Sequence, residues 1–257
     1  MGKKEKQCDP DNPADARKGD NWDHVAYDPE HRMVLGVIPG KRTAENTEAL
    51  VKDVKKRTGG RPMDLITTDE YKPYIRAILK AYGRRVDAPR SGRRGRPRAP
   101  HWEVPETLRY ATVHKTRENG RVVKVETRVI FGDRAGVEAA LKASKVSRHV
   151  NTAFVERHNG TDRNRNARKV RKTYCFSKDW DMHAAMTYFT MYTYNFCWPV
   201  RTLAIRDAPT CDKFGRDKFG RITPGRRHPQ TPAMAAHLTD HVWTLQEWIT
   251  FPAIQQN

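Results

Sequence analysis

The chain has 257 residues, of which 37% are hydrophobic and 31% are charged. That length supports one substantial core, and the high charge predicts exposed segments that bury little apolar surface. The formal net charge of +19 and the pI near 10.0 favour a polyanionic partner, above all nucleic acid. No run of about 18 apolar residues occurs and the N-terminus lacks the apolar core of a secretion signal, so we expect a soluble cytoplasmic protein without a membrane partner.

The four cysteines are scattered along the chain, without a Cys-x-x-Cys pair or a nearby histidine spacing typical of zinc. We interpret them as ordinary reduced thiols. They are Cys8, Cys175, Cys197 and Cys211.

The first elements expected are a β-hairpin and a helix. The runs Trp22–Tyr27 and Met33–Ile38 flank a turn rich in acidic residues and proline, which is typical of a hairpin. Thr43 can cap the following helix, and Gly59 and Gly60 can stop it because glycine tolerates positive φ.

A strand and a second helix are expected next. The apolar run from Met63 to Thr68 closes at Asp69, and Pro73 suits the first turn of a helix that extends to Tyr82. The order hairpin, helix, strand, helix predicts an α/β fold with a mixed sheet flanked by helices. Asp69 would then stand at the carboxyl end of a strand, where open α/β sheets form clefts.

The second half begins with a basic insertion, residues 84–109, rich in proline, glycine and arginine. Alternating residues in Tyr110–Lys115 and Val122–Phe131, around Asn119-Gly120, predict a second hairpin. The spacing of Val137, Ala140 and Leu141 predicts a short helix.

Further helices follow. Asn151 or Thr152 could cap a helix that contains Glu156, and Asp181–Trp198 reads as a long helix rich in aromatic residues and methionine. Its aromatic residues could form a base-stacking platform, but at helical spacing we interpret them as packing.

These elements predict three regions. Residues 1–205 form the core, residues 206–230 a linker, and residues 231–257 a helical C-terminal tail. The tail includes a helical segment around Ala233–Trp248, which is expected to dock on the domain or on another subunit.

Asp69 and Glu156 are the candidate catalytic and metal-binding residues. Carboxylate oxygens are the ligands that hold hard divalent cations during phosphodiester chemistry. Taken singly, Asp69 could be a turn or capping residue and Glu156 a solvated carboxylate. Their order and the elements that carry them favour metal binding.

Cationic residues surround Glu156 and continue beyond it. Asn159 and Arg163 fall on roughly the same helix face as Glu156. We interpret the stretch as a DNA-phosphate contact, although a merely solvated basic helix is an alternative. The expected contacts are Arg157, Asn159, Arg163, Arg165, Arg168, Lys169, Arg171 and Lys172.

A second basic segment, Ser91–Arg98, resembles the AT-hook, in which arginines enter the minor groove of A·T-rich DNA. A plain basic loop that contacts phosphates without sequence preference is an equal alternative. The expected contacts are Arg93, Arg94, Arg96 and Arg98.

Several motifs, spread over nearly the whole chain, resemble bacterial insertion-sequence transposases of the DDE class. The most specific motif is the block around Glu156. The motifs are Gly2-Lys3-Lys4, Leu65-Ile66-Thr67-Thr68-Asp69-Glu70-Tyr71, Asn151-Thr152-Ala153-Phe154-Val155-Glu156-Arg157-His158-Asn159, Arg171-Lys172-Thr173, Phe176-Ser177-Lys178, Tyr194-Asn195-Phe196 and Thr231-Pro232-Ala233-Met234-Ala235.

The resemblance implies a ribonuclease H-like fold, two Mg²⁺ or Mn²⁺ ions, cleavage at the ends of a mobile element and attack by the freed 3′-hydroxyl on target DNA. By position, Asp69 matches the second acidic residue of the family and Glu156 the third. The implied partners are double-stranded DNA, as element ends and target, and either further copies of the chain or intact transposase subunits. Such a protein would be nucleoid-associated.

The first acidic residue of the family is expected in a strand just before Gly2-Lys3-Lys4. We therefore expect an incomplete catalytic centre with weak or absent metal binding. Asp20, Asp23 or Asp28 could replace the first ligand, but the hairpin should hold them away from it. The alternative is a non-catalytic remnant that binds DNA or inhibits intact transposase.

Overall fold

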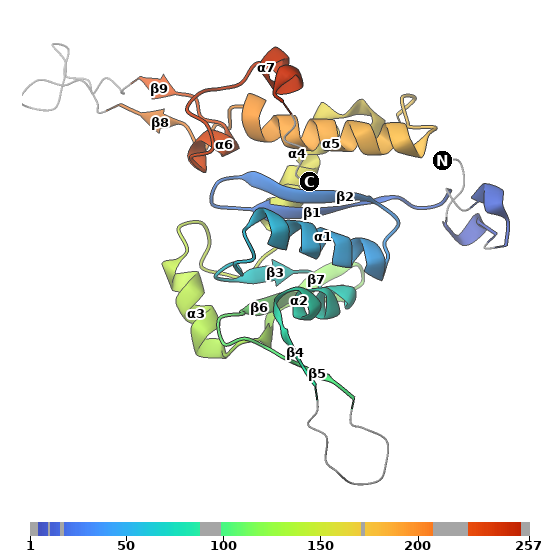
Figure 1. The fold of residues 1–257 in the computed structure, drawn as a ribbon, viewed down its shortest axis with the longest axis vertical. Helices are drawn as coiled ribbons and strands as arrows, with labels where there is room; N and C mark the ends of the chain where they lie inside the picture. The colour runs from blue at the N-terminus through green and yellow to red at the C-terminus, as the bar shows by residue number, and fades with distance from the viewer. Residues whose placement is uncertain are drawn as a thin grey trace, which may run out of the picture. The chain divides into compact units, whose positions relative to one another are not determined.

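The computed structural model describes residues 5–9, 11–15, 18–87, 99–170, 173–207 and 226–252. The expected α/β class is confirmed, since helices accompany a sheet that combines parallel and antiparallel pairs (Figure 1). The chain divides into two compact units. The first comprises residues 1–27 and 35–184, and the second residues 28–34 and 185–257, so the division does not fall at the predicted boundary of 205.

The first unit begins with two 3₁₀ turns, η1 (Glu5–Gln7) and η2 (Pro13–Asp15), and with the strands β1 (Trp22–Asp28) and β2 (Met33–Gly40). The two strands pair as the predicted hairpin, whose turn belongs to the second unit. Helix α1 (Ala44–Arg57) follows.

The predicted ends of α1 are confirmed. The Thr43 hydroxyl accepts a hydrogen bond from the Asn46 N–H, as an N-cap does. Beyond the helix, Gly59 and Gly60 have φ values of +62° and +82°, which only glycine adopts without steric cost.

A three-stranded mixed sheet follows in the same unit. Strand β3 (Ile66–Thr68) is parallel to β6 (Tyr110–Glu118), which is antiparallel to β7 (Arg121–Phe131). The strand expected from Met63 is thus only three residues long, because its partner β6 begins at Tyr110, opposite Ile66.

Two more predictions about this unit are confirmed. Asn119 and Gly120, with φ of 47° and 78°, form the tight turn between β6 and β7. Pro73 occupies the first turn of α2 (Pro73–Tyr82), where a missing N–H costs nothing.

Helices cover both faces of this sheet. On one face, Tyr110 and Leu108 pack with Val51 of α1 and Ile78 of α2. On the other face, Ala111 and Val113 of β6 pack with Val137 of the predicted helix α3 (Arg134–Ala143) and with Val150. Successive β6 residues therefore point to opposite cores, as strand geometry requires.

The basic insertion contains structure that was not expected from the sequence. Strands β4 (Arg84–Val86) and β5 (His101–Glu103) pair antiparallel, and Arg84 forms an ion pair with Glu103 at 2.6 Å. These strands are three residues long, too short for alternation to show in a segment rich in proline and arginine.

The first unit continues through α4 (Ala153–Arg165), η3 (Ala167–Lys169) and the start of α5 (Trp180–Cys197). Both helices were predicted. The N-cap of α4 is Thr152, although its side chain makes no capping hydrogen bond, and the Asn151 side chain accepts the Ala153 N–H.

The second unit holds most of α5, strands β8 (Ile205–Arg206) and β9 (Arg227–His228), and helices α6 (Pro232–Ala235) and α7 (Leu245–Thr250). Strands β8 and β9 pair with each other at the two ends of the predicted linker. The single helical segment expected in the tail is instead two short helices. His237 has a φ of +57°, which ends helical geometry, and Thr244 starts α7 with a capping box.

The packing predicted for helix α5 is confirmed in part: Met191 and Tyr194 are 1% and 5% exposed, whereas Tyr188 and Phe189 are 38% and 39% exposed. Within the second unit the Asn195 amide pairs with the backbone of Val34, accepting its N–H and donating to its carbonyl, both at 2.9 Å. Among the described residues, no helix combines the length and the apolar character needed to span a bilayer.

Candidate functional site

Asp69 directly follows β3, at its carboxyl end. One carboxylate oxygen accepts a hydrogen bond from the Arg42 guanidinium at 3.2 Å, and the other accepts the Tyr71 backbone N–H at 3.3 Å. The guanidinium of Arg42 lies over the rings of Trp22 and Tyr71, at 4.8 and 4.2 Å from their centroids. Asp69 is exposed, but its carboxylate is oriented by a turn and by a cation that two aromatic rings position.

Glu156 lies in the first turn of α4. Its Oε1 accepts a hydrogen bond from the Thr152 hydroxyl at 2.7 Å and from the Lys115 ammonium at 3.3 Å. The Thr152 hydroxyl, supported by Lys115, lowers the pKa of Glu156 below its usual value. The N-cap hydroxyl therefore holds the carboxylate instead of capping the backbone, and Glu156 is ionised at neutral pH.

The two acidic residues are held by different partners, Asp69 by Arg42 and Glu156 by Lys115. Leu65 packs with Ala111 and Val113, whereas Ile66 packs on the opposite face with Tyr110. Asp69 follows the last residue of β3, and its charge acts on Tyr74 and Tyr110, which belong to the Ile66 cluster. Lys115 is two residues after Val113 on the Leu65 face, and it contacts Glu156.

Glu70 was not singled out from the sequence. It forms ion pairs with His114 at 2.5 Å and with Arg128 at 2.9 Å. Val113 and Val129, the neighbours of His114 and Arg128 in sequence, pack with α3. His114 and Arg128 therefore point to the other face of the sheet, and Glu70 lies on that face, opposite to Lys115. The adjacent Thr68 hydroxyl and the Tyr110 hydroxyl are 2.7 Å apart.

Asp69 and Glu156 each offer hard oxygen donors, and each is exposed and paired with a cation that a metal ion would have to displace. In the part of the chain that the structure describes, no group of three or more His, Cys, Asp or Glu side chains is placed to hold a metal ion. Asp69 and Glu156 thus fit part of a coordination sphere, and waters or phosphate oxygens would have to supply the rest.

A buried charged cluster lies at the far end of α4. The Lys169 ammonium is 2.7 Å from Asp162 and 2.9 Å from Asp23, and these three side chains are 7%, 5% and 21% exposed. His183 Nε2 lies 3.8 Å from Asp23. Burial alone would raise the pKa of Asp23, but His183 and Lys169 outweigh it and keep that pKa below its usual value.

This cluster revises two sequence interpretations. Lys169 was expected to contact DNA, but its ammonium is buried between two carboxylates and is no longer a candidate. Asp23 was considered as a replacement metal ligand, but its carboxylate forms an ion pair with Lys169 instead. The signal that could have revealed the cluster is the helical phase of α4, because Phe154, His158 and Asp162 recur every four residues on its inner side.

The other predicted DNA contacts differ in exposure. Arg157 and Arg163 on α4 are exposed, whereas Asn159, Arg165 and Arg168 are half-buried. The remaining predicted contacts lie outside the described residues. They are Arg93, Arg94, Arg96, Arg98, Arg171 and Lys172.

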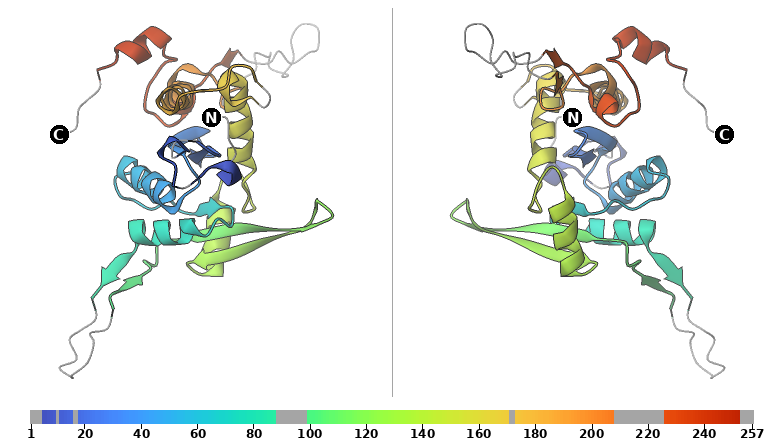
Figure 2. Two further views of the ribbon diagram at one scale, coloured as in Figure 1. Left: turned by 90° about the vertical axis from the view of Figure 1, so that its right-hand side faces the viewer. Right: turned by 90° about the vertical axis from the view of Figure 1, so that its left-hand side faces the viewer.

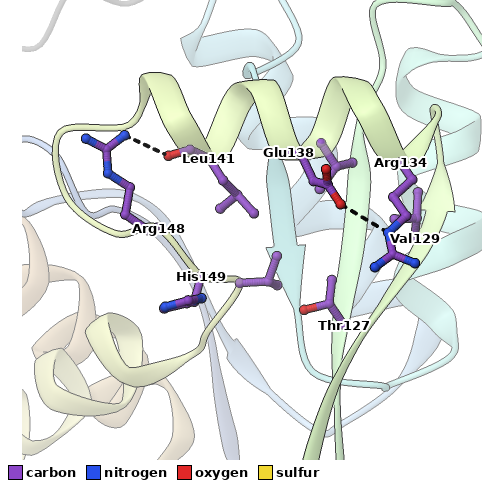
Figure 3. A pocket seen from close by; sticks show the side chains of 9 residues that line it. Thr127, Val129, Arg134, Glu138, Leu141, Arg148 and His149 are labelled. Atoms are coloured by element: carbon purple, nitrogen blue, oxygen red, sulfur yellow. Dashed lines mark hydrogen bonds and ion pairs between the residues drawn. The ribbon is translucent and has the colours of Figure 1, made fainter.

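Figure 3 shows a cavity of about 430 Å³ between β7 and α3. Val129, Val137, Leu141 and Val150 make it largely apolar. Glu138, the one carboxylate among its lining residues, is bound to Arg134 at 3.1 Å. The cavity therefore offers no reactive pair of its own.

His158 makes stability depend on pH. It is 4% exposed and stacks on Tyr27 with 4.8 Å between the ring centroids. Burial lowers its pKa to about 4, from about 6.5 in the unfolded chain. The unfolded state therefore binds the proton more readily, and the stability that this ring contributes is lost as pH falls from about 6.5 toward about 4.

We expect wild-type unfolding free energy to fall by about 2 kcal/mol between pH 7 and pH 5 through this ring. Urea unfolding in the presence of a chelator, at several pH values, measures it. His158→Phe should flatten the dependence, whereas His149→Gln, at an exposed position, should leave it unchanged. Equal pH dependence in wild type and His158→Phe would contradict the assignment.

The chain matches no family model, no curated protein and no solved structure, so its function must be argued from its own residues and geometry.

Proposed function

We propose that the chain is a ribonuclease H-like core of a DDE transposase, a class that cleaves DNA and transfers the freed strand with Mg²⁺ or Mn²⁺, and that its centre is incomplete, with Asp69 and Glu156 as two of the expected acidic ligands and with weakened metal binding. One observation carries the proposal. Asp69 directly follows a strand of a mixed sheet, and Glu156, in the first turn of a later helix, contacts Lys115 of a neighbouring strand. The sequence motifs around both residues imply a strand end and a later helix as the elements that carry them.

The order of elements supports the same proposal. A hairpin, a helix and a strand precede α2, the next strand of the mixed sheet is β6, and α4 carries Glu156. Helices cover both faces of the mixed sheet. A fold of this kind places residues from distant parts of the chain at one edge of the sheet.

The residues of the site would act by holding charge. Asp69 and Glu156 would bind the cation, and their present partners, Arg42 and Lys115, would be released toward a DNA phosphate. A bound Mg²⁺ or Mn²⁺ would activate the attacking oxygen and stabilise the leaving oxygen. The exposed guanidinium groups of Arg157 and Arg163 would position the backbone beside Glu156.

A nicking assay on supercoiled plasmid DNA, with Mg²⁺ or Mn²⁺ and with chelator, tests this function. We expect metal-dependent nicking that falls to background in Asp69→Asn and Glu156→Gln, with plasmid binding retained. Asp64→Asn and Glu138→Gln remove exposed carboxylates elsewhere in the unit and should nick as wild type does. Absence of nicking in the wild type, or full nicking in either site variant, would refute the catalytic proposal.

A second candidate is a non-catalytic DNA-binding protein that acts on DNA or on intact transposase subunits. It is favoured by the exposed positions of Arg157 and Arg163, because contacts with DNA phosphates need no metal ion. Salt-sensitive binding to the same plasmid, unchanged by Mg²⁺ or chelator and without nicking, is the expected result for this candidate.

A further inference from the structure

The strands β6 and β7 extend far beyond the body of the first unit, as Figure 2 shows for the green two-stranded ribbon. Their pairing explains this. Strand β3 pairs with β6 only from Tyr110 to Thr112. From Val113 onward, β7 is the only strand that pairs with β6 among the described residues. We name residues 115–125, the outer part of this hairpin, the β-arm.

Apolar side chains are exposed on the β-arm. Val122, Val123 and Val125 are 45%, 53% and 58% exposed, and they lie close together in the sequence of β7. A two-stranded ribbon buries little surface of its own, so packing within the ribbon does not account for three exposed valines. Their exposure indicates a contact with something outside the unit.

The charge of the β-arm indicates what that partner is. Lys115, Arg117, Arg121 and Lys124 are exposed cations, and Glu118 is the single carboxylate in the arm. Lys124 is paired with Glu126, just beyond the arm, at 2.7 Å, which leaves Arg117 and Arg121 as the arm's excess charge near the tip. Pairing between two such arms would bring like charges together, which opposes a second copy of the chain as the occupant. A polyanion that also offers apolar surface satisfies both features.

Duplex DNA is such a partner. Its major groove, about 12 Å wide, admits a two-stranded β-ribbon, its walls are phosphates, and thymine methyl groups line its floor. The base of the arm is also placed for this, because Lys115 contacts Glu156 at 3.3 Å. DNA engaged at Glu156 would therefore lie beside the arm.

We propose that the β-arm inserts into the groove of duplex DNA bound next to Glu156, with its cations on the phosphates and its valines on the base edges. The inference rests on the proposed function as far as DNA binding is concerned, and it does not require cleavage. It assigns the DNA contact to a segment that neither basic sequence motif includes.

Anisotropy titration of a fluorescent duplex at several salt concentrations tests the proposal. The triple variant Arg117→Gln, Arg121→Gln, Lys124→Gln should bind about 10- to 100-fold more weakly at physiological salt, with a salt slope reduced by about two to three. The matched control Lys52→Gln, Lys56→Gln, Arg61→Gln removes the same charge from exposed positions outside the arm. The control should lose much less affinity.

The valines are tested separately. Val122→Thr, Val123→Thr, Val125→Thr keeps shape and strand preference, and it should weaken binding while the salt slope stays the same. A duplex with 5-bromouracil in place of thymine should photo-crosslink to peptides of the β-arm, which mass spectrometry locates. Light scattering of the valine variant shows whether it changes oligomeric mass.

The outcomes separate this inference from the proposed function. If the wild type binds the duplex and the arm variants bind as the control does, or if crosslinks avoid the β-arm, the arm inference alone is overturned. A change of oligomeric mass in the valine variant with unchanged DNA affinity would assign the arm to a second copy and also overturn it. If the wild type binds no DNA at low salt, both proposals fail.

Discussion

Lys169→Ala should lower the free energy of unfolding by about 3 to 5 kcal/mol. The ammonium is 7% exposed and balances Asp162 and Asp23, so its loss leaves two carboxylates in a poorly solvated site. The Coulomb gain of such a cluster roughly offsets the cost of burying it, but removing the shared cation leaves that cost unbalanced. Urea unfolding at pH 7, followed by circular dichroism, measures the loss.

Two comparisons isolate the cause of that loss. Arg163→Ala removes an exposed cation from the neighbouring helix and should cost less than about 0.5 kcal/mol. Adding Asp162→Asn to Lys169→Ala should recover part of the stability, because one uncompensated carboxylate is then neutral. Additive losses in the double variant would show that the two residues do not share a cluster.

Asn195→Ala should cost about 2 to 4 kcal/mol. The Asn195 amide satisfies both the N–H and the carbonyl of Val34, and the two residues are 4% and 2% exposed. Alanine would leave a buried donor and a buried acceptor without partners, and each carries a desolvation penalty of about 1 to 3 kcal/mol. Hydrogen exchange at the Val34 amide should accelerate together with the loss of stability.

Asn164→Ala provides the control for this prediction. Asn164 is exposed on α4, so the same substitution there should change stability by less than about 0.5 kcal/mol. Asn195→Asp distinguishes the two bonds, since aspartate can still accept the Val34 N–H but cannot donate to its carbonyl. Wild-type stability in Asn195→Ala would show that the pair contributes nothing.

The sequence predicts most of the helices and both long hairpins, because these elements carry strong local signals. Thr43 and Pro73 mark helix starts, and Asn119-Gly120 marks a tight turn. The short pair of β4 and β5 has no such signal. The break between α6 and α7 depends on the positive φ of His237, which the sequence alone does not indicate.

The candidate site is predictable only in part. The motifs single out Asp69 and Glu156, and the sequence predicts the strand end and the helix that carry them. Their partners, Arg42 and Lys115, come from other elements, so the contacts arise from tertiary packing that no local pattern encodes. The burial of Lys169 was missed because the basic stretch was considered by itself, although the helical phase of α4 places Asp162 on the inner side.

Strand β7 contains two bulge residues, Val123 and Ile130, which have no partner residue on β6. The register of the pair shifts at Thr116/Arg117 and at Tyr110/Ala111. Each extra residue bends a ribbon and increases its twist. Deleting Val123 would restore a regular ladder and straighten the hairpin, re-aiming the arginines near its tip while the sheet beneath keeps its register. A single bulge residue, Val123, thus sets the direction in which the end of this hairpin points.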